Sequence, residues 1–483
     1  MNYKIISYFL GWVLKVEAIA MVIPFIISAA LKEDSWPWFL ACILFSGLLG
    51  LFLSRKKMRQ GNFYIREGYV ATGLSWLLMS LVGALPFYLS GRIPSYIDAF
   101  FEMSSGFTTT GSSILEDIDS LGKGLIFWRS FSHWIGGMGV LVLILAILPM
   151  NGGYHMQFMK AESPGPSVSK LVPRVSDTAK TLYGIYFGMT VVAILTLLIS
   201  GMPLFDAVLM GVGAAGTGGF AISNQGLSCY NTVSQALITV WMILFGINFN
   251  VYYLIARKKY KDALKCEEMR YYLLFIAAAT LIFTVVTWQT NYKNEGLFYA
   301  FHHCFFTVGS LITSTGYGTV DFNLWPETLK MLILLLMFSG ACAGSTGGGF
   351  KVSRVIILAK EAKKEFYLLF HPSAVRTVKF EGKTVEHSVI RSINNYLIIY
   401  LMTFTGSLLL ISLDGFDLTT NFSAVLATLN NIGPGLGAVG PASNFSAYSV
   451  FSKLVLSFDM IAGRLELLPV LALFYRKTWI KHN

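Results

Sequence analysis

The chain has 483 residues, of which 54% are hydrophobic and only 13% are charged, and its formal net charge is +11. Soluble domains carry about 25% charged residues, so this composition excludes an ordinary soluble protein and indicates a membrane protein. The positive charge does not call for nucleic acid as a partner, because cytoplasmic loops of membrane proteins are rich in lysine and arginine.

Apolar runs follow one another along the whole chain, and roughly 20 apolar residues cross a bilayer as a helix. The ten runs are 5–31, 38–53, 74–89, 140–149, 185–200, 236–255, 271–288, 329–338, 396–413 and 450–473. The first run is too long for a cleaved signal peptide and contains Lys15 and Glu17, so we expect it to remain as a membrane helix. No alternating pattern suits a barrel, and we therefore predict an all-α integral membrane protein.

The basic residues predict the orientation of these spans. With the N-terminus in the cytoplasm, the inward loops carry most of the lysine and arginine, above all in 55–66, 257–270 and 351–391. The outward loops hold only Lys32, Arg92, Lys123, Lys293 and Lys453. This asymmetry predicts a multi-pass protein of the cell (inner, cytoplasmic) membrane, surrounded by lipid, with both termini in the cytoplasm.

Four of the outward connections share one pattern. Each contains an apolar stretch too short to cross a bilayer, followed by glycine and hydroxyl residues. The stretches are "DAFFEMSSGFTTTGSS" from Asp98, "DAVLMGVGAAGTGGFA" from Asp206, "YAFHHCFFTVGSLITSTGYGTVDF" from Tyr299 and "NFSAVLATLNNIGPGLG" from Asn421. Alignment places Gly111, Gly218, Gly316 and Gly433 in one column, preceded by Thr110, Thr217, Thr315 and Ile432.

This pattern predicts four tandem helix–re-entrant pore loop–helix repeats around a pseudo-fourfold pore, with two extra N-terminal transmembrane helices outside it. The predicted boundaries are 1–60 for the N-terminal pair and 66–150, 178–258, 268–360 and 388–478 for the pore repeats. The third repeat has a broken return helix.

The chemistry of these loops suits a dehydrated monovalent cation. "TSTGYGTVDF", 313–322, resembles the ion-selective strand of a potassium channel, in which backbone carbonyls replace the water around the ion. Glycine permits the backbone angles that this requires, and each short helix would direct its negative C-terminal end toward a central cation. The predicted potassium-binding residues are Thr109, Thr110, Gly111, Thr217, Gly218, Thr315, Gly316, Ile432 and Gly433.

Acidic residues of the outward loops, among them Asp98, Glu102, Asp117, Asp414 and Asp417, should concentrate cations at the pore mouth. For any single residue, simple solvation of a loop tip is an equally good interpretation.

Two features of the third and fourth repeats stand out. "GACAGSTGGG", 340–349, interrupts a helical pattern from 329 to 359, and its five glycines each cost roughly 1 kcal/mol relative to alanine in a helix. Close helix packing by small residues is the alternative. Arg464 lies deep in the last apolar run, so it pairs with Asp459 or Glu466, or it faces the pore below the filter.

Several stretches together carry a family resemblance that covers essentially the whole chain. They are "TTTGSS" at Thr108, "WRSFSHWIGGMGVLVLILAILP" at Trp128, "TSTGYGT" at Thr313, "GACAGSTGGGFKVSR" at Gly340, "NNIGPGLG" at Asn430 and "GRLELLPVLALF" at Gly463. The chain resembles the Trk/Ktr/HKT superfamily of potassium transporters, and within it the Trk-type (TrkH-like) membrane subunit, which the two extra N-terminal helices favour. The second stretch, "AGTGGFA", departs from the serine-bearing version of that family.

The resemblance implies potassium uptake by a homodimer in which each subunit has its own pore, with a filter glycine in each repeat. It also implies that the glycine-rich segment is an intramembrane gate, and the gate residues would be Gly344, Ser345, Thr346, Gly347, Gly348 and Arg464. Finally, it implies a cytoplasmic regulatory subunit that binds NAD, ATP or ADP. This chain has no strand-flanked GxGxxG motif, so we expect no organic cofactor in it.

Two other functions compete with this interpretation. A secondary cation-coupled solute symporter with broken helices usually has two inverted halves, whereas these four repeats share one sense. A membrane enzyme with a metal site is suggested by His302, His303 and Cys304, but these residues have no second matching cluster, and packing or hydrogen bonding explains them better. The five scattered cysteines indicate neither disulfides nor a metal site, and we expect no enzymatic activity.

Overall fold

The computed structural model describes residues 3–55, 65–139 and 175–479, which are helical apart from loops and one short hairpin. The predicted span at 140–149 lies outside the described residues. Within them, six helical stretches are long and apolar enough to cross a membrane, or seven if one bent helix pair counts as a span. The six are Tyr3–Ala30, Trp36–Leu53, Arg66–Leu89, Ala179–Ile199, Glu267–Thr290 and His387–Asp414. The prediction of an all-α membrane fold is confirmed.

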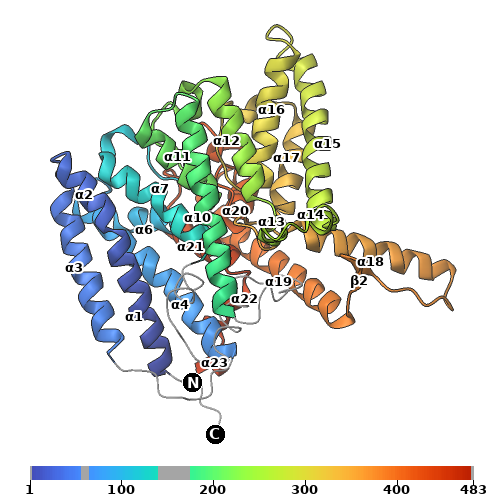
Figure 1. Cartoon of the computed structure of the whole chain (residues 1–483), viewed down its shortest axis with the longest axis horizontal. Coiled ribbons are helices and arrows are strands. Elements are labelled where there is room, and N and C mark those ends of the chain that lie inside the picture. The colour runs from blue at the N-terminus through green and yellow to red at the C-terminus, as the bar shows by residue number, and fades with distance from the viewer. Residues whose placement is uncertain (1–2, 56–64, 140–174, 480–483) are drawn as a thin grey trace.

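The two N-terminal spans form a helical hairpin along one side of the molecule (Figure 1). The hairpin comprises α1 (Tyr3–Ala20), α2 (Val22–Ala30) and α3 (Trp36–Leu53). α1 and α3 approach so closely that a Cβ atom built on Gly11 would lie only 2.7 Å from the carbonyl oxygen of Gly50. α3 exposes Leu44, Leu48 and Phe52, as a helix facing lipid does.

Four units of similar order follow, each with a first helix, a short helix, an extended loop segment and a return helix. The first helices are α4 (Ile65–Gly83), continued by α5 (Leu85–Leu89), α10 (Val175–Ile199), α15 (Glu267–Thr290) and α19 (His387–Ile411). The short helices are α6 (Tyr96–Phe107), α11 (Leu204–Gly216), α16 (Leu297–Ile312) and α20 (Leu418–Leu429). The return helices are α7 (Lys123–Gly137), α12 (Thr232–Phe245), α17 (Glu327–Ser339) and α21 (Val450–Arg464).

The short helices cannot cross a bilayer. They contain 12 to 16 residues. A helix rises 1.5 Å per residue, so they span about 18–24 Å against roughly 30 Å of hydrocarbon. Two of them begin at side-chain caps: Ser95 accepts from the backbone N–H of Asp98, and Asp417 accepts from that of Thr420. The chain therefore enters, stops at membrane depth and turns back.

The units pack cyclically. Each return helix contacts the short helix of the next unit: α7 contacts α11, α12 contacts α16, α17 contacts α20, and α21 contacts α6. Because the fourth unit returns to the first, the four units close into a ring about a common axis.

Three return helices are followed by breaks. After α12 the chain bends by 90° into α13 (Phe249–Ala256), and after α17 a glycine-rich loop precedes α18 (Val352–Phe370). α21 ends at Arg464, and α22 (Leu468–Phe474) begins after three residues. The predictions of continuous spans over 236–255 and 450–473 were therefore wrong. The second break arises at Glu466 and Leu467, whose φ angles of 54° and 65° are left-handed and cannot continue a helix.

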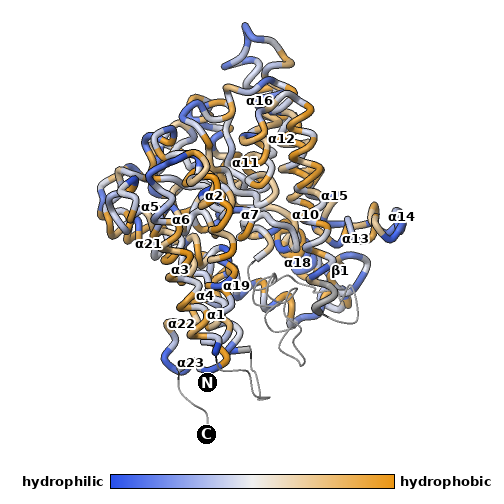
Figure 2. Tube along the Cα trace, turned by 60° about the vertical axis from the view of Figure 1, so that its left-hand side comes forward, coloured by the Kyte–Doolittle hydropathy of each residue, from blue (hydrophilic) through white to orange (hydrophobic). Residues whose placement is uncertain are grey.

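Four short elements lie outside the helices described so far. They are α14 (Tyr260–Leu264), β1 (Lys379–Phe380), β2 (Lys383–Thr384) and α23 (Arg476–Trp479), and the two strands pair antiparallel. The Tyr3 hydroxyl donates to the carbonyl oxygen of Trp479 at 3.2 Å, so the described ends of the chain meet. α18 and the β1–β2 hairpin extend from the helical body (Figure 1), and the tube in Figure 2 is hydrophobic along α15 and hydrophilic at α14.

Candidate functional site

Four extended stretches, which we name the first to fourth ring segments, leave the short helices with the same backbone geometry. They comprise residues 108–112, 216–220, 313–317 and 430–434. Each contains a residue with a left-handed φ of 54–57°: Thr109, Thr217, Ser314 and Asn431. The N–H of the following residue donates to the carbonyl five residues earlier at 2.8–2.9 Å, which pairs Thr110 with Ser105, Gly218 with Gly213, Thr315 with Ser310, and Ile432 with Ala427. This repeated turn fixes which residues are equivalent.

A glycine occupies the next position of every ring segment. These glycines are Gly111, Gly219, Gly316 and Gly433. A Cβ atom on Gly111 would lie 2.9 Å from the backbone nitrogen of Gly219, and one on Gly433 would lie 2.9 Å from the carbonyl oxygen of Thr110. Cβ atoms on Gly219 and Gly316 would collide with the carbonyl oxygens of Thr315 and Ile432. The contacts run from the first segment through the fourth and back to the first, so only glycine fits where the segments approach most closely.

The structure corrects the predicted register of the second ring segment by one residue. The alignment placed Gly218 in the column of Gly111, but Gly219 occupies that position, and Thr217 is equivalent to Thr109 rather than to Thr110. A Cβ atom on Gly218 would collide with the imidazole of His133 and not with a neighbouring ring segment. Two consecutive glycines leave the sequence alignment ambiguous. The left-handed residue that ends α11 is Thr217, and this makes Gly219 the residue equivalent to Gly111.

Neutral oxygen groups are concentrated in the ring. The hydroxyls of Thr108 and Thr110 lie 2.7 Å apart, as do those of Thr313 and Thr315. The side-chain amide of Asn431 donates to the Thr110 hydroxyl at 3.0 Å, which joins the fourth segment to the first. Hydroxyl and carbonyl oxygens are hard ligands suited to alkali cations, and the C-terminal ends of four short helices meet here with partial negative charge.

The glycine-rich loop, residues 340–351 between α17 and α18, packs against the third and fourth ring segments. The N–H of Gly348 donates to the Ser314 hydroxyl at 2.5 Å. A Cβ atom on Gly347 would lie 2.8 Å from the carbonyl oxygen of Thr313, and one on Gly348 would collide with that of Asn430. The structure thus brings Gly347 and Gly348 of the predicted gate against the ring, whereas the carbonyl oxygen of Gly344 accepts from the N–H of Phe249 at the start of α13.

Arg464 joins three parts of this site. One guanidinium nitrogen donates to the Thr109 hydroxyl at 3.1 Å and to the carbonyl oxygen of Thr346 at 2.7 Å. The other donates to the carbonyl oxygens of Gly136 and Gly137, at the end of α7, at 2.7 and 2.6 Å. The Arg464 guanidinium group therefore contacts the first ring segment, the glycine-rich loop and a return helix.

The two acidic residues considered as partners for Arg464 have other hydrogen bonds. Asp459 accepts from the Ser407 hydroxyl at 2.6 Å, and Glu466 forms an ion pair with Arg354. Lys351 donates to the carbonyl oxygen of Gly347. Of the two interpretations of Arg464, the position beside the ring and the loop agrees with the structure.

Glu268, at the start of α15, holds the glycine-rich loop from the other side. Its Oε1 atom accepts from the backbone N–H of Ala343 at 2.7 Å and from that of Ser353 at 3.1 Å, so a single oxygen joins the loop to the first turn of α18. Glu268 is 3% exposed. No sequence motif marks this residue, because a glutamate in the first turn of a helix is ordinary.

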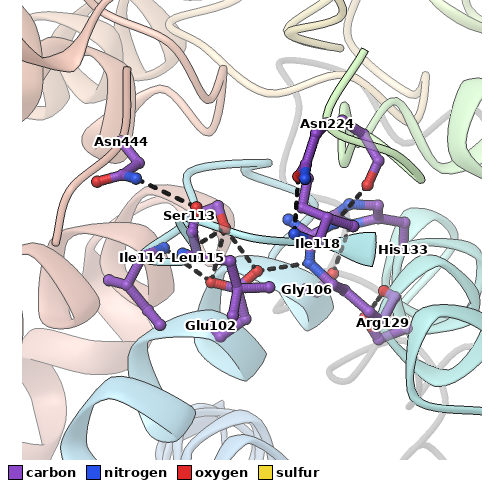
Figure 3. A network of polar contacts seen from close by, with 12 residues as sticks. Glu102, Gly106, Ser113, Ile114, Leu115, Ile118, Arg129, His133, Asn224 and Asn444 are labelled. Atoms are coloured by element: carbon purple, nitrogen blue, oxygen red, sulfur yellow. Dashed lines mark hydrogen bonds and ion pairs between the residues drawn. The ribbon is translucent and has the colours of Figure 1, made fainter. Parts of the chain in front are cut away.

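The acidic residues of the outer face divide into two groups. Asp117 is exposed, and the side-chain hydrogen bond from Asn224 lowers its pKa below the ordinary value. The side-chain hydrogen bond from Thr420 likewise lowers the pKa of Asp417. Glu102, in contrast, is fully buried and forms an ion pair with Arg129 (Figure 3), so its predicted role at the pore mouth was wrong.

The histidine pair in α16 is hydrogen-bonded. His302 lies 2.8 Å from the side-chain oxygen of Gln235, and His303 lies 2.9 Å from the Thr319 hydroxyl. Over the described ranges, no group of three histidine, cysteine, aspartate or glutamate residues could hold a metal ion. These contacts agree with the packed role preferred for the pair.

Known proteins resemble the chain along nearly its entire length. The TrkH family model, described as a cation transport protein, matches residues 37–479. The Trk system potassium uptake protein TrkH of Salmonella typhimurium is 34% identical over 99% of this chain and 100% of that protein. TrkG of Escherichia coli, of the same description, is 32% identical over 99% of both chains. The crystal structure of the potassium transporter TrkH from Vibrio parahaemolyticus aligns with a TM-score of 0.89 at 29% identity, covering 99% of this chain and 100% of that one.

Proposed function

This chain belongs to the TrkH family of cation transport proteins, and on that premise we propose that it takes up potassium across the cytoplasmic membrane through the ring of four segments. The family is one of transporters and not of enzymes. The observation that carries the proposal is the closed contact sequence of Gly111, Gly219, Gly316 and Gly433. Four backbones held this closely around one axis can surround a dehydrated cation with oxygen atoms.

The potassium ligands in this proposal are backbone and hydroxyl oxygens of the ring segments. They belong to Thr109, Thr110, Gly111, Thr217, Gly218, Gly219, Thr315, Gly316, Ile432 and Gly433. The mouth is acidic, and charged groups such as Asp117 raise the local concentration of cations.

In the same proposal the glycine-rich loop is the gate. Gly344, Ser345, Thr346, Gly347 and Gly348 form its centre, and its contacts with the third and fourth ring segments support this role. Arg464 adds a positive charge beside the path, which opposes the passage of cations while the loop is in place. Opening requires the loop to leave the ring, which breaks the hydrogen bond between Thr346 and Arg464.

We further propose the assembly that the family suggests: a homodimer with one pore per subunit, and a cytoplasmic regulatory subunit that binds NAD, ATP or ADP. α18 and the β1–β2 hairpin, which extend from the helical body next to the glycine-rich loop, are where such a subunit would act (Figure 1). The termini would face the cytoplasm. Addition of nucleotide should change transport only when the regulatory subunit is present.

Rubidium uptake into liposomes tests the transport proposal. The purified chain should load ⁸⁶Rb⁺ down its gradient, potassium should compete better than sodium, and bilayers with mixed potassium and sodium should give a potassium-directed reversal potential. Dependence of uptake on an added solute gradient would instead identify a cation-coupled symporter. Absence of rubidium flux from folded protein, with and without the regulatory subunit, would overturn the proposal.

Gly316→Ser tests the filter within the same assay. Gly316 has a φ of 86°, and its Cβ atom would collide with the carbonyl oxygen of Ile432, so serine must push the third and fourth segments apart. We expect weaker discrimination between potassium and sodium. Gly406→Ser in α19 is the matched control, because a Cβ atom there meets no atom within 4 Å.

A further inference from the structure

A buried ion pair lies between the first and second ring segments (Figure 3). Nε of Arg129, on α7, donates to Oε1 of Glu102, on α6, at 2.5 Å, and the side chains are 1% and 0% exposed. The motif "WRSFSHW" at 128–134 supplies Arg129 and, four residues later on the same helix face, His133.

Glu102 holds the residues that directly follow the first ring segment. Its carboxylate accepts from the Ser113 hydroxyl at 3.0 and 3.1 Å and from the backbone N–H of Ile114 at 3.0 Å. Ser112, the residue between Gly111 and Ser113, donates from its hydroxyl to the carbonyl oxygen of Gly433 at 2.9 Å. A shift of the Glu102 carboxylate would therefore displace the chain where the first segment meets the fourth.

Arg129 holds the second ring segment. Its NH1 group donates to the carbonyl oxygen of Ala221 at 2.6 Å, and its guanidinium carbon lies 3.6 Å from the ring centre of Phe220. Phe220 directly follows Gly219, the glycine that closes the ring. Bidentate, planar and always charged, arginine can make both contacts while also pairing with Glu102.

His133, one turn after Arg129 on α7, also joins α6 to the second ring segment. Its Nδ1 atom lies 2.8 Å from the carbonyl oxygen of Gly106 on α6, and its ring centre lies 4.3 Å from that of Phe220. A Cβ atom on Gly218 would collide with this imidazole. Arg129 and His133 thus fill the space between α6 and the second ring segment, opposite Glu102 and Gly106 respectively.

We infer that Glu102 and Arg129 are positioning residues that fix the separation of the first and second ring segments and thereby set cation selectivity. This inference rests on the proposed potassium pathway. Neither side chain supplies a ligand to the ion. Their charge-assisted hydrogen bonds keep the two backbones from spreading, so that the ring cannot relax to accommodate a differently hydrated cation.

Glu102→Gln tests the inference, because the amide keeps the shape and one acceptor but loses the charge that pairs with Arg129. We expect the potassium-to-sodium permeability ratio, from reversal potentials, to fall about tenfold, as when a residue that orients an ion ligand is removed. Glu361→Gln is the matched control, because it makes the same carboxylate-to-amide change on α18. It breaks the ion pair between Glu361 and Lys364, whose side-chain atoms lie 2.7 Å apart and which both belong to α18 and not to a ring segment. This control should keep the ratio even if it lowers the unfolding temperature.

Phe220→Leu provides a second, milder variant that removes the aromatic face under Arg129 and retains apolar volume. It should lower the permeability ratio in the same direction, and it decides the question if Glu102→Gln does not fold. An unchanged ratio in the folded variants would overturn the inference, as would an equal loss in Glu361→Gln. Absence of cation flux from the unmodified protein would instead overturn the proposed function.

Discussion

Arg464 donates a hydrogen bond of 2.7 Å to the carbonyl oxygen of Thr346, and this bond connects the end of α21 to the centre of the glycine-rich loop. The same side chain reaches the Thr109 hydroxyl and the last carbonyl oxygens of α7. The loop is therefore held by the Arg464 side chain, which is itself fixed by the first ring segment and by the end of α7.

Arg464→Ala should increase rubidium flux into liposomes. A hydrogen bond to a charged group contributes roughly 1.5–3 kcal/mol, so loss of the contact with Thr346 shifts the loop toward its open position by about tenfold or more. The substitution also removes a positive charge from the path. Lys330→Ala, which removes a cation from the outer end of α17, is the control. Equal flux through Arg464→Ala and the unmodified protein would refute the role of Arg464 in the gate.

The corrected register predicts different outcomes at two adjacent glycines. Gly219→Ala should abolish transport, and no side-chain change should restore it, because its Cβ atom collides with the backbone of Thr315. Gly218→Ala collides with a side chain, so Gly218→Ala combined with His133→Ala should recover part of the rubidium uptake. The opposite result would contradict the corrected register. In that case the Gly219→Ala, His133→Ala double variant would recover rubidium uptake and the Gly218→Ala, His133→Ala double variant would not, which would return Gly218 to the column of Gly111.

Glu268→Ala should also raise basal flux, because it releases the N–H groups of Ala343 in the loop and of Ser353 in the first turn of α18. Glu268→Gln is the matched variant. Both bonds go to a single oxygen atom, so a side-chain amide oxygen can accept them and basal flux should stay close to that of the unmodified protein. Identical flux through the alanine and glutamine variants would show that these hydrogen bonds do not restrain the loop.

Asp417→Ala should lower the free energy of unfolding by about 1 kcal/mol at neutral pH, since Asp417 caps the first turn of α20. The pKa of Asp417 is lower in the folded protein than its ordinary value, because the Thr420 hydroxyl donates to the carboxylate. Its contribution is thus complete above the ordinary pKa and disappears as pH falls through the lower, folded-state pKa. Thermal unfolding in detergent at several pH values measures this, and Asp417→Asn should keep the cap without the pH dependence.

The sequence was sufficient to predict the helical membrane fold, because long apolar runs leave few arrangements. It left two arrangements open for Arg464, an ion pair with Asp459 or Glu466 and a position at the pore, and only the folded contacts distinguish them. It was insufficient for the second ring segment, where two adjacent glycines carry no side chain to mark the register. The end of α21 was also missed, since Glu466 and Leu467 do not resemble a helix stop. Glu102 was misplaced because its partner, Arg129, is 27 residues away in the sequence and meets it only after the chain has turned back.

All four ring segments belong to one polypeptide, and their surroundings need not be identical. A channel built from four copies of one subunit would repeat each side chain on every side of its axis. Here the position that holds Glu102 in the first short helix holds Met210, Thr307 and Ala424 in the other three. One quadrant can consequently be altered or labelled with a single reporter group while the other three keep their native chemistry.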